Sequence, residues 1–407
     1  MPTTGSHACG SCRKNGGMAG RIVLLGATGY TGRLTAAAMV EQGLPPVLAA
    51  RNEAALLTLQ SELHAKATVG RGRKKTQLPL LEIAVADVFD ADSVNALVAE
   101  GDVLVTTVGP FAQYGAAALE AAIAKGATYI DCTGEPTFLR EVFDEWGPRA
   151  EAAGVALLPA FGYDYVPGNL AGALALDHAR DTTSRVTRLD VLYAIRGSLK
   201  TSGGTAASAA AMALERGMGF RGGRLIEERP GARTWASRHD GRSWQGLSVG
   251  ATEHWTMPRL SSDLLDVSVY LGWAAGRTEQ AAKAAALADA VGRLPGAKSA
   301  WSYLAKKVVP GSSGGPDADE RAQATTLCIA EARTLRGEVA SHVVVEGPSP
   351  YDLTAALLTW AAVSARDGQV QGAGALGLVD AFGFDQAVEG CAALGLREVP
   401  ESAEESD

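Results

Sequence analysis

A glycine-rich turn directly after a short apolar run is the feature that most restricts the fold of this 407-residue chain. Residues 21–25 read Arg-Ile-Val-Leu-Leu, the pattern of a strand buried on both faces, and a helical pattern follows to about residue 42. Glycines between them permit a tight turn and let backbone N–H groups approach a pyrophosphate. This strand–turn–helix context predicts a dinucleotide site. Its predicted binding residues are Gly26, Ala27, Thr28, Gly29, Tyr30, Thr31 and Gly32.

Strand and helix patterns alternate over the first 170 residues. Alternation of this kind predicts an α/β fold with a Rossmann-type, doubly wound parallel sheet and right-handed crossovers. The other apolar runs suited to buried strands lie at 46–50, 80–86, 103–108, 128–131 and 155–161, and helical patterns lie at 52–64, 91–99, 114–125 and 136–153.

After about residue 170 the pattern changes to extended, β-branched runs with polar ends. We expect an inserted α+β domain with a mostly antiparallel sheet, in which Arg336-Gly337 turns the last hairpin. The predicted strands lie at 185–195, 264–273, 322–332 and 338–345, and the predicted helices at 204–217, 277–292 and 298–308. The predicted organisation is a flexible tail at 1–19, a dinucleotide-binding Rossmann domain at 20–170, an α+β substrate or dimerisation domain at 171–345, and C-terminal helices at 346–400 that pack back on the Rossmann domain.

Composition and charge exclude several classes of protein. The chain has 37 Lys and Arg against 45 Asp and Glu, a formal net charge of −8 that does not favour nucleic acid or an anionic membrane as a partner. No uncharged apolar stretch reaches the roughly 18 residues of a membrane helix, and the first 19 residues have no apolar segment typical of a signal peptide. We therefore expect a soluble, cytoplasmic protein with no membrane span and with small molecules as ligands.

The cysteines and histidines predict neither disulfides nor a metal site. Five cysteines are an odd and low number for a disulfide framework. Cys9 and Cys12 form a C-x-x-C without a second ligand pair, and the six histidines show no metal-ligand spacing. No metal is expected.

The choice of dinucleotide depends on the end of the second predicted strand. NAD enzymes usually place an acidic residue there for the ribose 2′-hydroxyl, whereas this chain has Arg51 and Asn52 after two alanines. Because arginine binds phosphate in bidentate fashion, we predict NADP(H) as the cofactor. Two further strand ends face the same groove. Asp87 is expected near the adenine, and Gly109, Pro110 and Phe111 are expected along the nicotinamide side.

Asp131 and Glu135 end another predicted strand at this groove. Polar groups at strand ends in this fold either hold a loop or contact the ligand, and both interpretations stay open for these two carboxylates.

Five motifs in order resemble the saccharopine dehydrogenase-like oxidoreductases, in particular the branch that includes trans-acting enoyl reductases. The resemblance covers about residues 21–175 and resumes at 202–205 and 347–351. It implies a Rossmann domain, an inserted α+β domain that often mediates homodimerisation, and NADP(H)-dependent reduction. The motifs occupy residues 26–32, 49–52, 108–115, 129–136 and 161–169.

The chain departs from the family where the family commonly has Gly-Phe-Asp-Ser-x-Pro-x-Asp. Tyr165 replaces the serine and Asn169 replaces the second acid, so the substrate cannot be carried over by analogy. We expect hydride transfer from NADPH to an electron-poor C=C bond of a small or medium organic substrate. Imine or ketone reduction of the saccharopine-reductase type is the alternative, and a non-catalytic NADP(H)-binding sensor or scaffold is an alternative of another class.

The proton source of this reduction has four candidates. Tyr165 leads, because a phenol donates a proton while it stays neutral at pH 7. Asp164 and Tyr114 are expected to face the groove as well, and Lys200 is the candidate from the second domain. Water remains the alternative, in which case the tyrosines only shape an apolar pocket.

Two other enzyme classes have superficial matches. A short-chain reductase needs Tyr-x-x-x-Lys in the cofactor domain, but Tyr303 and Lys307 lie far downstream on a predicted helix. The G-x-S-x-G at 246–250 resembles a nucleophile elbow, which needs a strand before the serine and a helix after it. Both flanks are predicted to be extended, so we do not expect a hydrolase.

Overall fold

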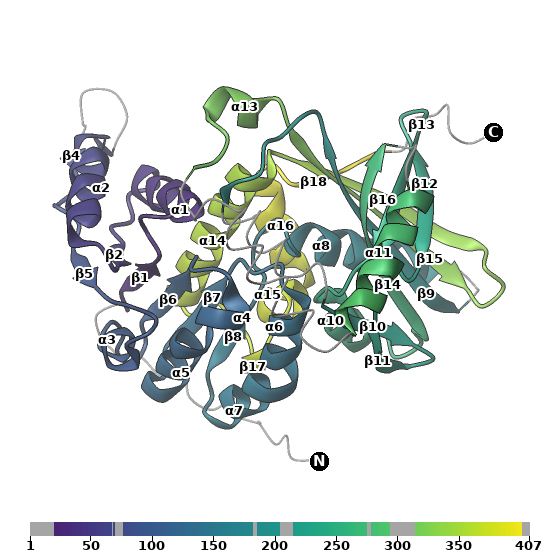
Figure 1. Cartoon of the computed structure of the whole chain (residues 1–407), viewed down its shortest axis with the longest axis horizontal. Helices are drawn as coiled ribbons and strands as arrows, with labels where there is room; N and C mark the ends of the chain where they lie inside the picture. Colours follow the sequence, from purple (N-terminus) through teal and green to yellow (C-terminus); the bar gives the residue numbers. More distant parts are fainter. Residues whose placement is uncertain are drawn as a thin grey trace, which may run out of the picture.

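The computed structural model describes residues 20–66, 68–69, 76–181, 185–203, 215–274, 278–293 and 314–400 of the chain. Two sheets with helices around them form the molecule, and helix α8 (Val166–His178) lies between them (Figure 1). The basic run at 71–75, the predicted helix at 298–308 and both cysteines of the tail fall outside the described residues.

The first sheet has seven strands in the order β17-β8-β7-β6-β1-β2-β5, and every pair is parallel. The direction of strand order reverses between β1 and β6, which is the switch point where such sheets bind ligands. This confirms the predicted Rossmann-type sheet. The strands are β1 (Ile22–Leu25), β2 (Val47–Ala50), β5 (Ile83–Val85), β6 (Val103–Thr106), β7 (Thr128–Asp131), β8 (Ala156–Leu158) and β17 (Gly374–Ala375).

Helices cover both faces of this sheet, and its strands β1, β2 and β6 are accordingly fully buried. Helix α14 packs against α1 and against β6 and β7. The predicted single helix at 136–153 is divided by one π-helical turn, η1. The helices are α1 (Tyr30–Glu41), α2 (Glu53–Lys66), α3 (Ala91–Asn95), α4 (Phe111–Tyr114), α5 (Ala116–Lys125), α6 (Pro136–Glu141), η1 (Val142–Trp146), α7 (Gly147–Ala152), α14 (Pro350–Arg366), α15 (Leu378–Phe382) and α16 (Phe384–Ala393).

The second sheet has nine strands and is antiparallel except where β14 runs parallel to β9. This confirms the predicted, mostly antiparallel sheet. Its strands are β9 (Val186–Arg196), β10 (Gly217–Arg221), β11 (Arg224–Glu228), β12 (Thr234–His239), β13 (Arg242–Ser248), β14 (Asp266–Ala274), β15 (Thr325–Thr334), β16 (Val339–Gly347) and β18 (Arg397–Val399). The accompanying helices are the 3-10 turn η2 (Ala179–Asp181), α10 (Glu253–Leu260), α11 (Thr278–Gly292) and α13 (Ala318–Ala322). Separately, the short strands β3 (Thr68–Val69) and β4 (Thr76–Gln77) pair antiparallel.

Two predictions about this half of the chain are wrong. The helix predicted to reach residue 217 does not, because Gly217 begins strand β10. The extended run predicted up to Trp255 is also interrupted, since helix α10 begins at Glu253. The C-terminal segment divides between the sheets: α14 and β17 lie with the first, whereas β18 pairs with β16 of the second.

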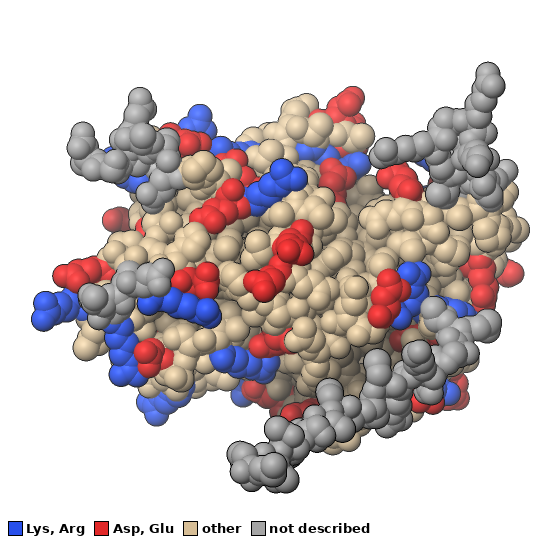
Figure 2. All heavy atoms as spheres, turned by 180° about the vertical axis from the view of Figure 1, so that it is seen from behind, with Lys and Arg blue, Asp and Glu red and all other residues tan. Residues whose placement is uncertain are grey.

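Surface charge is mixed, and no helix of the described residues is long and apolar enough to cross a membrane. On the face seen in Figure 2, acidic and basic side chains are interspersed rather than gathered by sign. This face therefore offers no large basic patch of the kind that binds nucleic acid.

Candidate functional site

The glycine-rich turn connects β1 to α1 at the switch point of the parallel sheet. Gly26 has φ +88, and a Cβ there would lie 2.8 Å from Oγ1 of Thr107. A Cβ at Gly32 would lie only 2.2 Å from the carbonyl oxygen of Gly26. Helix α1 begins after Gly29 with no side chain capping its N-terminus. The turn thus fits a pyrophosphate, because its close packing requires glycine and the start of the helix presents backbone N–H groups.

The end of β2 carries the residues predicted to select the dinucleotide. Arg51 is exposed directly after the buried Ala49 and Ala50, so its guanidinium is available to a phosphate. Asn52 has a local role: its Oδ1 accepts a 3.1 Å hydrogen bond from the backbone N–H of Ala55 and caps α2. No carboxylate stands at this strand end.

The residue predicted near the adenine also organises its own turn. Oδ1 of Asp87 accepts a 3.1 Å hydrogen bond from the N–H of Phe89, and the Asp87 N–H donates to Oγ of Ser93. Asp87 is partly buried at the end of β5.

Glu135 holds the turn expected along the nicotinamide side. Its two carboxylate oxygens accept hydrogen bonds from the N–H groups of Phe111 (2.9 Å) and Ala112 (3.0 Å) at the start of α4. Glu135 is buried, and the bond to Phe111 fixes the turn through Gly109 and Pro110. A carboxylate at a helix N-terminus is favourable, so the geometry favours the loop-holding interpretation.

Asp131 has a similar role one strand away. Its carboxylate is fully buried and accepts hydrogen bonds from the hydroxyl of Tyr129 and from the N–H groups of Thr133 and Ala160. Burial raises the pKa of this carboxyl to about 6 although these hydrogen bonds oppose the shift. Asp131 ties the end of β7 to the segment after β8.

The hydroxyl of Tyr165 faces backbone oxygens of two loops, one that follows β7 and one that precedes α10. It lies 3.2 Å from the carbonyl oxygen of Gly134 and 3.1 Å from that of Gly250. Tyr165 is buried, and burial raises the pKa of its phenol well above the usual value. A phenol has one proton, and both neighbours are hydrogen-bond acceptors. The proton of Tyr165 is therefore already donated to a carbonyl oxygen of the protein.

Asp164 differs from its neighbour. It is partly buried, and a Cβ on Gly134 would lie 2.9 Å from its Oδ2, so the carboxyl lies against the loop that follows β7. Burial raises the pKa of Asp164 to about 6, with no hydrogen bond from a described residue to oppose it. The adjacent Tyr163 is partly buried as well, and its backbone N–H donates to Oγ1 of Thr354 on α14.

The remaining two proton-donor candidates lie apart from Asp164. The partly buried ring of Tyr114 packs edge-to-face against the exposed Phe89, with ring centroids 5.3 Å apart. Lys200 is exposed and forms an ion pair with Glu320 of α13. Neither contact places the side chain against the loops that follow β7 and β8.

A buried carboxylate of the second domain was not among the predicted residues. Oε1 of Glu253, at the start of α10, accepts a 2.6 Å hydrogen bond from the hydroxyl of Tyr193. That hydroxyl also accepts the N–H of Gly168 at 2.8 Å. Burial raises the pKa of Glu253 to about 7. No sequence signal locates Glu253, because the pattern around this residue predicts an extended segment.

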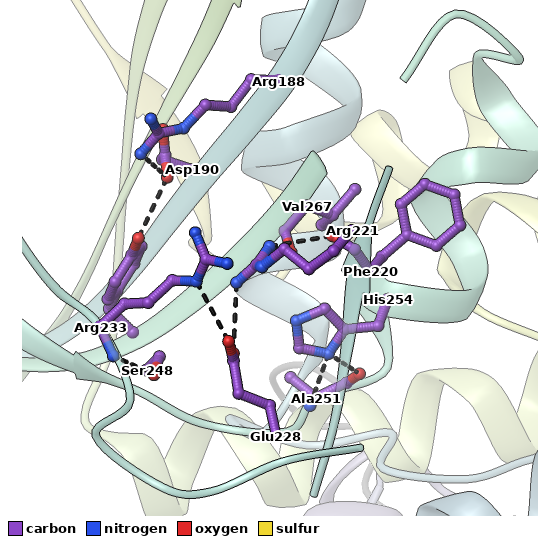
Figure 3. Close-up of polar contacts among 11 residues, drawn as sticks. Arg188, Asp190, Phe220, Arg221, Glu228, Arg233, Ser248, Ala251, His254 and Val267 are labelled. Atoms are coloured by element: carbon purple, nitrogen blue, oxygen red, sulfur yellow. Dashed lines mark hydrogen bonds and ion pairs between the residues drawn. The ribbon is translucent and has the colours of Figure 1, made fainter. Parts of the chain in front are cut away.

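A second polar cluster lies within the second domain (Figure 3). The buried Arg221 donates to Glu228 at 3.3 Å and to the carbonyl oxygen of Val267, and its own burial lowers its pKa. Burial, and secondly the charge of Arg221, lowers the pKa of His254 to about 3, so this imidazole is neutral at pH 7. The cluster joins β10, β11, β14 and α10.

The G-x-S-x-G segment does lie before a helix, contrary to the sequence prediction, since β13 ends at Ser248 and α10 follows. However, Oγ of Ser248 accepts a 3.0 Å hydrogen bond from the N–H of Arg233, whereas Nδ1 of His254 contacts Ala251 (Figure 3). Ser248 is buried, and among the described residues its hydroxyl is not hydrogen-bonded to an imidazole. This is not the geometry of a nucleophile and its base.

One cluster of potential metal ligands lies at strands β12 and β16 and at the turn that follows β12. His239, Asp240 and Glu346 bring their ligand atoms within 4.8 Å of one another. The guanidinium of Arg196 pairs with both carboxylates, at 2.5 Å and 2.8 Å. The negative charge of the two carboxylates, which a bound cation would neutralise, is therefore already balanced by the positive charge of Arg196.

Part of the chain that forms the parallel sheet is similar to a known family. Residues 22–158 match the model of the saccharopine dehydrogenase NADP binding domain. A putative trans-acting enoyl reductase of Mycobacterium tuberculosis is 35% identical over 192 residues, which are 46% of this chain and 42% of that protein. A lipid droplet localized protein of Caenorhabditis elegans is 29% identical over 153 residues, 37% of this chain and 34% of that protein. The chain therefore matches less than half the length of these relatives.

One solved structure is similar over nearly the whole chain. The saccharopine dehydrogenase (L-Glu forming) of Saccharomyces cerevisiae superposes with a TM-score of 0.58, covering 93% of this chain and 99% of that one at 10% sequence identity. At this identity the likeness concerns the fold. The chain thus has the saccharopine dehydrogenase fold, and its residues 22–158 match the family model of the saccharopine dehydrogenase NADP binding domain.

Proposed function

We propose that this protein is an NADPH-dependent reductase that delivers a hydride to an electron-poor C=C bond of a small or medium organic molecule. The observation that carries the proposal is the glycine-dependent turn at Gly26–Gly32 with its uncapped helix start, followed at the end of β2 by Arg51 instead of a carboxylate. The turn suits a dinucleotide pyrophosphate, and the guanidinium suits a ribose 2′-phosphate. The mycobacterial relatives are named trans-acting enoyl reductases, which supports the enoyl type of acceptor.

The residues at the strand ends divide the work of binding and orientation. Backbone N–H groups at the start of α1 hold the pyrophosphate, and Arg51 binds the 2′-phosphate. The turn through Gly109 and Pro110, fixed by Glu135, shapes the nicotinamide side. NADPH, when bound there, supplies the hydride. The protein's contribution is to hold donor and acceptor at reacting distance and to exclude water.

We assign the proton transfer to Asp164 rather than to Tyr165. The phenol of Tyr165 already faces two carbonyl oxygens, whereas the Asp164 carboxyl has its hydrogen-bonding capacity free among the described residues. Since its pKa is raised to about 6, roughly one tenth of Asp164 is protonated at pH 7, and this acid form can protonate the carbon or oxygen that gains charge. Tyr165 then serves to join the loops of Gly134 and Gly250.

A C=N acceptor is the second candidate, and the same carboxyl favours it. In its ionised form Asp164 would stabilise the positive charge of an iminium group, because the two charges attract in a partly desolvated site. Both acceptors therefore belong in the test of the proposal.

The test is titration with NADPH and NADH, followed by NADPH oxidation in the presence of activated alkenes, imines and ketones. We expect NADPH to bind more tightly than NADH, and activated alkenes to be reduced fastest. A preference for NADH would contradict the cofactor assignment. NADPH binding without oxidation by any of the three acceptor classes would support the non-catalytic sensor instead.

A further inference from the structure

Tyr30, the first residue of α1, is held by a segment of the second half of the chain. We call residues 314–322 the strap; it comprises an extended stretch and helix α13, which lies above α1 and α14 in Figure 1. The hydroxyl of Tyr30 donates a 2.5 Å hydrogen bond to the carbonyl oxygen of Pro316. A Cβ on Gly315 would lie 2.5 Å from the Tyr30 ring, so the strap backbone lies directly on this ring.

Arg321 is the centre of this contact. Its Nη1 donates to the hydroxyl of Tyr30 at 3.3 Å and to the carbonyl oxygen of Pro316 at 3.1 Å. Its Nε donates a 2.7 Å hydrogen bond to Oδ1 of Asp352 on α14. The Arg321 side chain is only 15% exposed, so one guanidinium joins the strap, the glycine-rich turn and α14.

A second set of contacts supports the same arrangement from α14. The ring of Tyr351 packs edge-to-face on Tyr30 with centroids 5.1 Å apart, and its hydroxyl accepts a 2.6 Å hydrogen bond from the N–H of Ser202. The neighbouring Gly203 donates its N–H to the carbonyl oxygen of Gly314 at 3.1 Å. Three segments far apart in sequence therefore converge on the side chain of one residue in the dinucleotide turn.

We propose that the strap is part of the dinucleotide site, with Arg321 as a positioning residue that acts through Tyr30. By holding the Tyr30 side chain, Arg321 and Pro316 fix the first turn of α1, whose N–H groups receive the pyrophosphate. Because this turn is already ordered before the cofactor binds, binding loses less conformational entropy, and the affinity for the cofactor is higher. This inference rests on the proposed dinucleotide binding, not on the identity of the reduced substrate.

The role of the strap predicts a specific pattern of cofactor affinities. The pyrophosphate is common to NADPH, NADH and ADP-ribose, so loss of the strap contact weakens all three by the same factor. Loss of Arg51, in contrast, weakens NADPH selectively, because only NADPH carries the 2′-phosphate. A change that merely unfolds the protein would lower the melting temperature and the fraction of protein able to bind, and would leave the dissociation constants of the remaining folded protein unchanged.

The experiment compares Tyr30→Phe, Arg321→Ala and Arg321→Lys with the wild type in titrations with NADPH, NADH and ADP-ribose. Tyr30→Phe removes only the hydroxyl. Arg321→Lys keeps the charge but loses the fork that spans Tyr30 and Asp352. The control is Arg336→Ala, which removes an exposed arginine at the tip of the β15–β16 hairpin.

We expect Arg321→Ala to raise all three dissociation constants about tenfold, as the loss of one charge-assisted hydrogen bond would, with Arg321→Lys intermediate and Arg336→Ala unchanged. Tyr30→Phe combined with Arg321→Ala should cost no more than Arg321→Ala alone, because the two side chains act through one contact. Dissociation constants within twofold of the wild type for both Tyr30→Phe and Arg321→Ala would overturn the inference. A wild type that binds none of the three ligands would instead contradict the proposed function.

Discussion

The hydroxyl of Tyr193 donates a 2.6 Å hydrogen bond to the carboxylate of Glu253, and both side chains are buried where the second sheet meets α8. The same hydroxyl accepts the N–H of Gly168 in the first turn of α8. Strand β9, helix α8 and helix α10 are therefore joined through one phenol oxygen. Because a buried carboxylate is costly even when it is hydrogen-bonded, the pKa of Glu253 is raised from 4.5 to about 7.

This raised pKa predicts how stability depends on pH. The folded protein binds the Glu253 proton more tightly than the unfolded chain, so this contribution to stability is complete below about pH 4.5 and is lost as the pH rises to about 7. The loss at pH 8 amounts to about 3 kcal/mol. Glu253→Gln keeps the acceptor for Tyr193 and removes the titration. We expect its free energy of unfolding to exceed that of the wild type at pH 8 and to be close to it at pH 5.

Chemical denaturation at pH 5, 6, 7 and 8 measures this difference. The exposed Glu100→Gln serves as the control and should follow the wild type at every pH. If the curves of Glu253→Gln and the wild type stay parallel from pH 5 to pH 8, the carboxyl does not titrate in this range and our account of it is wrong.

Cofactor preference depends on Arg51. Replacing it with alanine removes the guanidinium that we assign to the 2′-phosphate, so the dissociation constant for NADPH should rise roughly 10- to 100-fold. The constant for NADH should change less than threefold. Fluorescence titration with both nucleotides measures this, with Arg336→Ala as the matched surface control. Equal losses for both nucleotides would remove the basis for assigning NADP(H).

Substitutions at Asp164 and at the neighbouring Tyr165 distinguish between the two candidate proton donors. Asp164→Asn should lower turnover about 100-fold or more with NADPH affinity intact, since general acids contribute on this scale. The wild-type rate should fall as the pH rises through about 6, the pKa of Asp164, because the acid form is the active one.

Tyr165→Phe is the matched variant. It should keep turnover within tenfold of the wild type and lower the free energy of unfolding by about 1–3 kcal/mol, because the carbonyl oxygens of Gly134 and Gly250 lose the single phenol proton that they share. The reverse result, in which Tyr165→Phe abolishes turnover and Asp164→Asn does not, would return the proton to the phenol.

Alanine substitutions at Gly29 and Gly32 form a pair of variants that differ in how much room the glycine-rich turn leaves for a new Cβ. A Cβ on Gly32 would approach the Gly26 carbonyl oxygen to 2.2 Å, whereas a Cβ on Gly29 would lie 3.3 Å from the same oxygen. Gly32→Ala must therefore displace the backbone of the turn, and we expect NADPH binding to be lost. Gly29→Ala should raise the dissociation constant less than tenfold. Titration of both variants checks the order, and equal affinities would contradict this geometry of the turn.

The parallel sheet could be predicted from sequence because its strands are buried on both faces. Val103–Thr106, for example, is a continuous apolar run that ends beside polar and glycine residues. The hairpin of β12 and β13 could not be recognised by apolar runs, since Thr234–His239 contains only two apolar residues, Trp235 and Ala236. Its turn, Asp240-Gly241, was nevertheless a usable signal, because this dipeptide favours tight hairpins.

The site shows where sequence patterns stop being informative. A strand-end position locates Asp131, Glu135 and Asp164 at one edge of the sheet, but it does not say which carboxyl is already paired. Glu135 accepts two backbone N–H groups at the start of α4, whereas Asp164 accepts none from the described residues. Contacts such as that of Arg321 with Tyr30 join residues 291 positions apart, and no local pattern encodes them.

The central claim is hydride transfer from NADPH to carbon, and isotope transfer tests it most directly. The protein is incubated with an α,β-unsaturated thioester and NADPH deuterated at C4, in separate reactions for the two faces of the ring, and the product is examined by mass spectrometry. We predict a saturated thioester that gains one deuterium at the β-carbon from one of the two labelled faces. Tight NADPH binding with no deuterium in the product from either face would contradict the account.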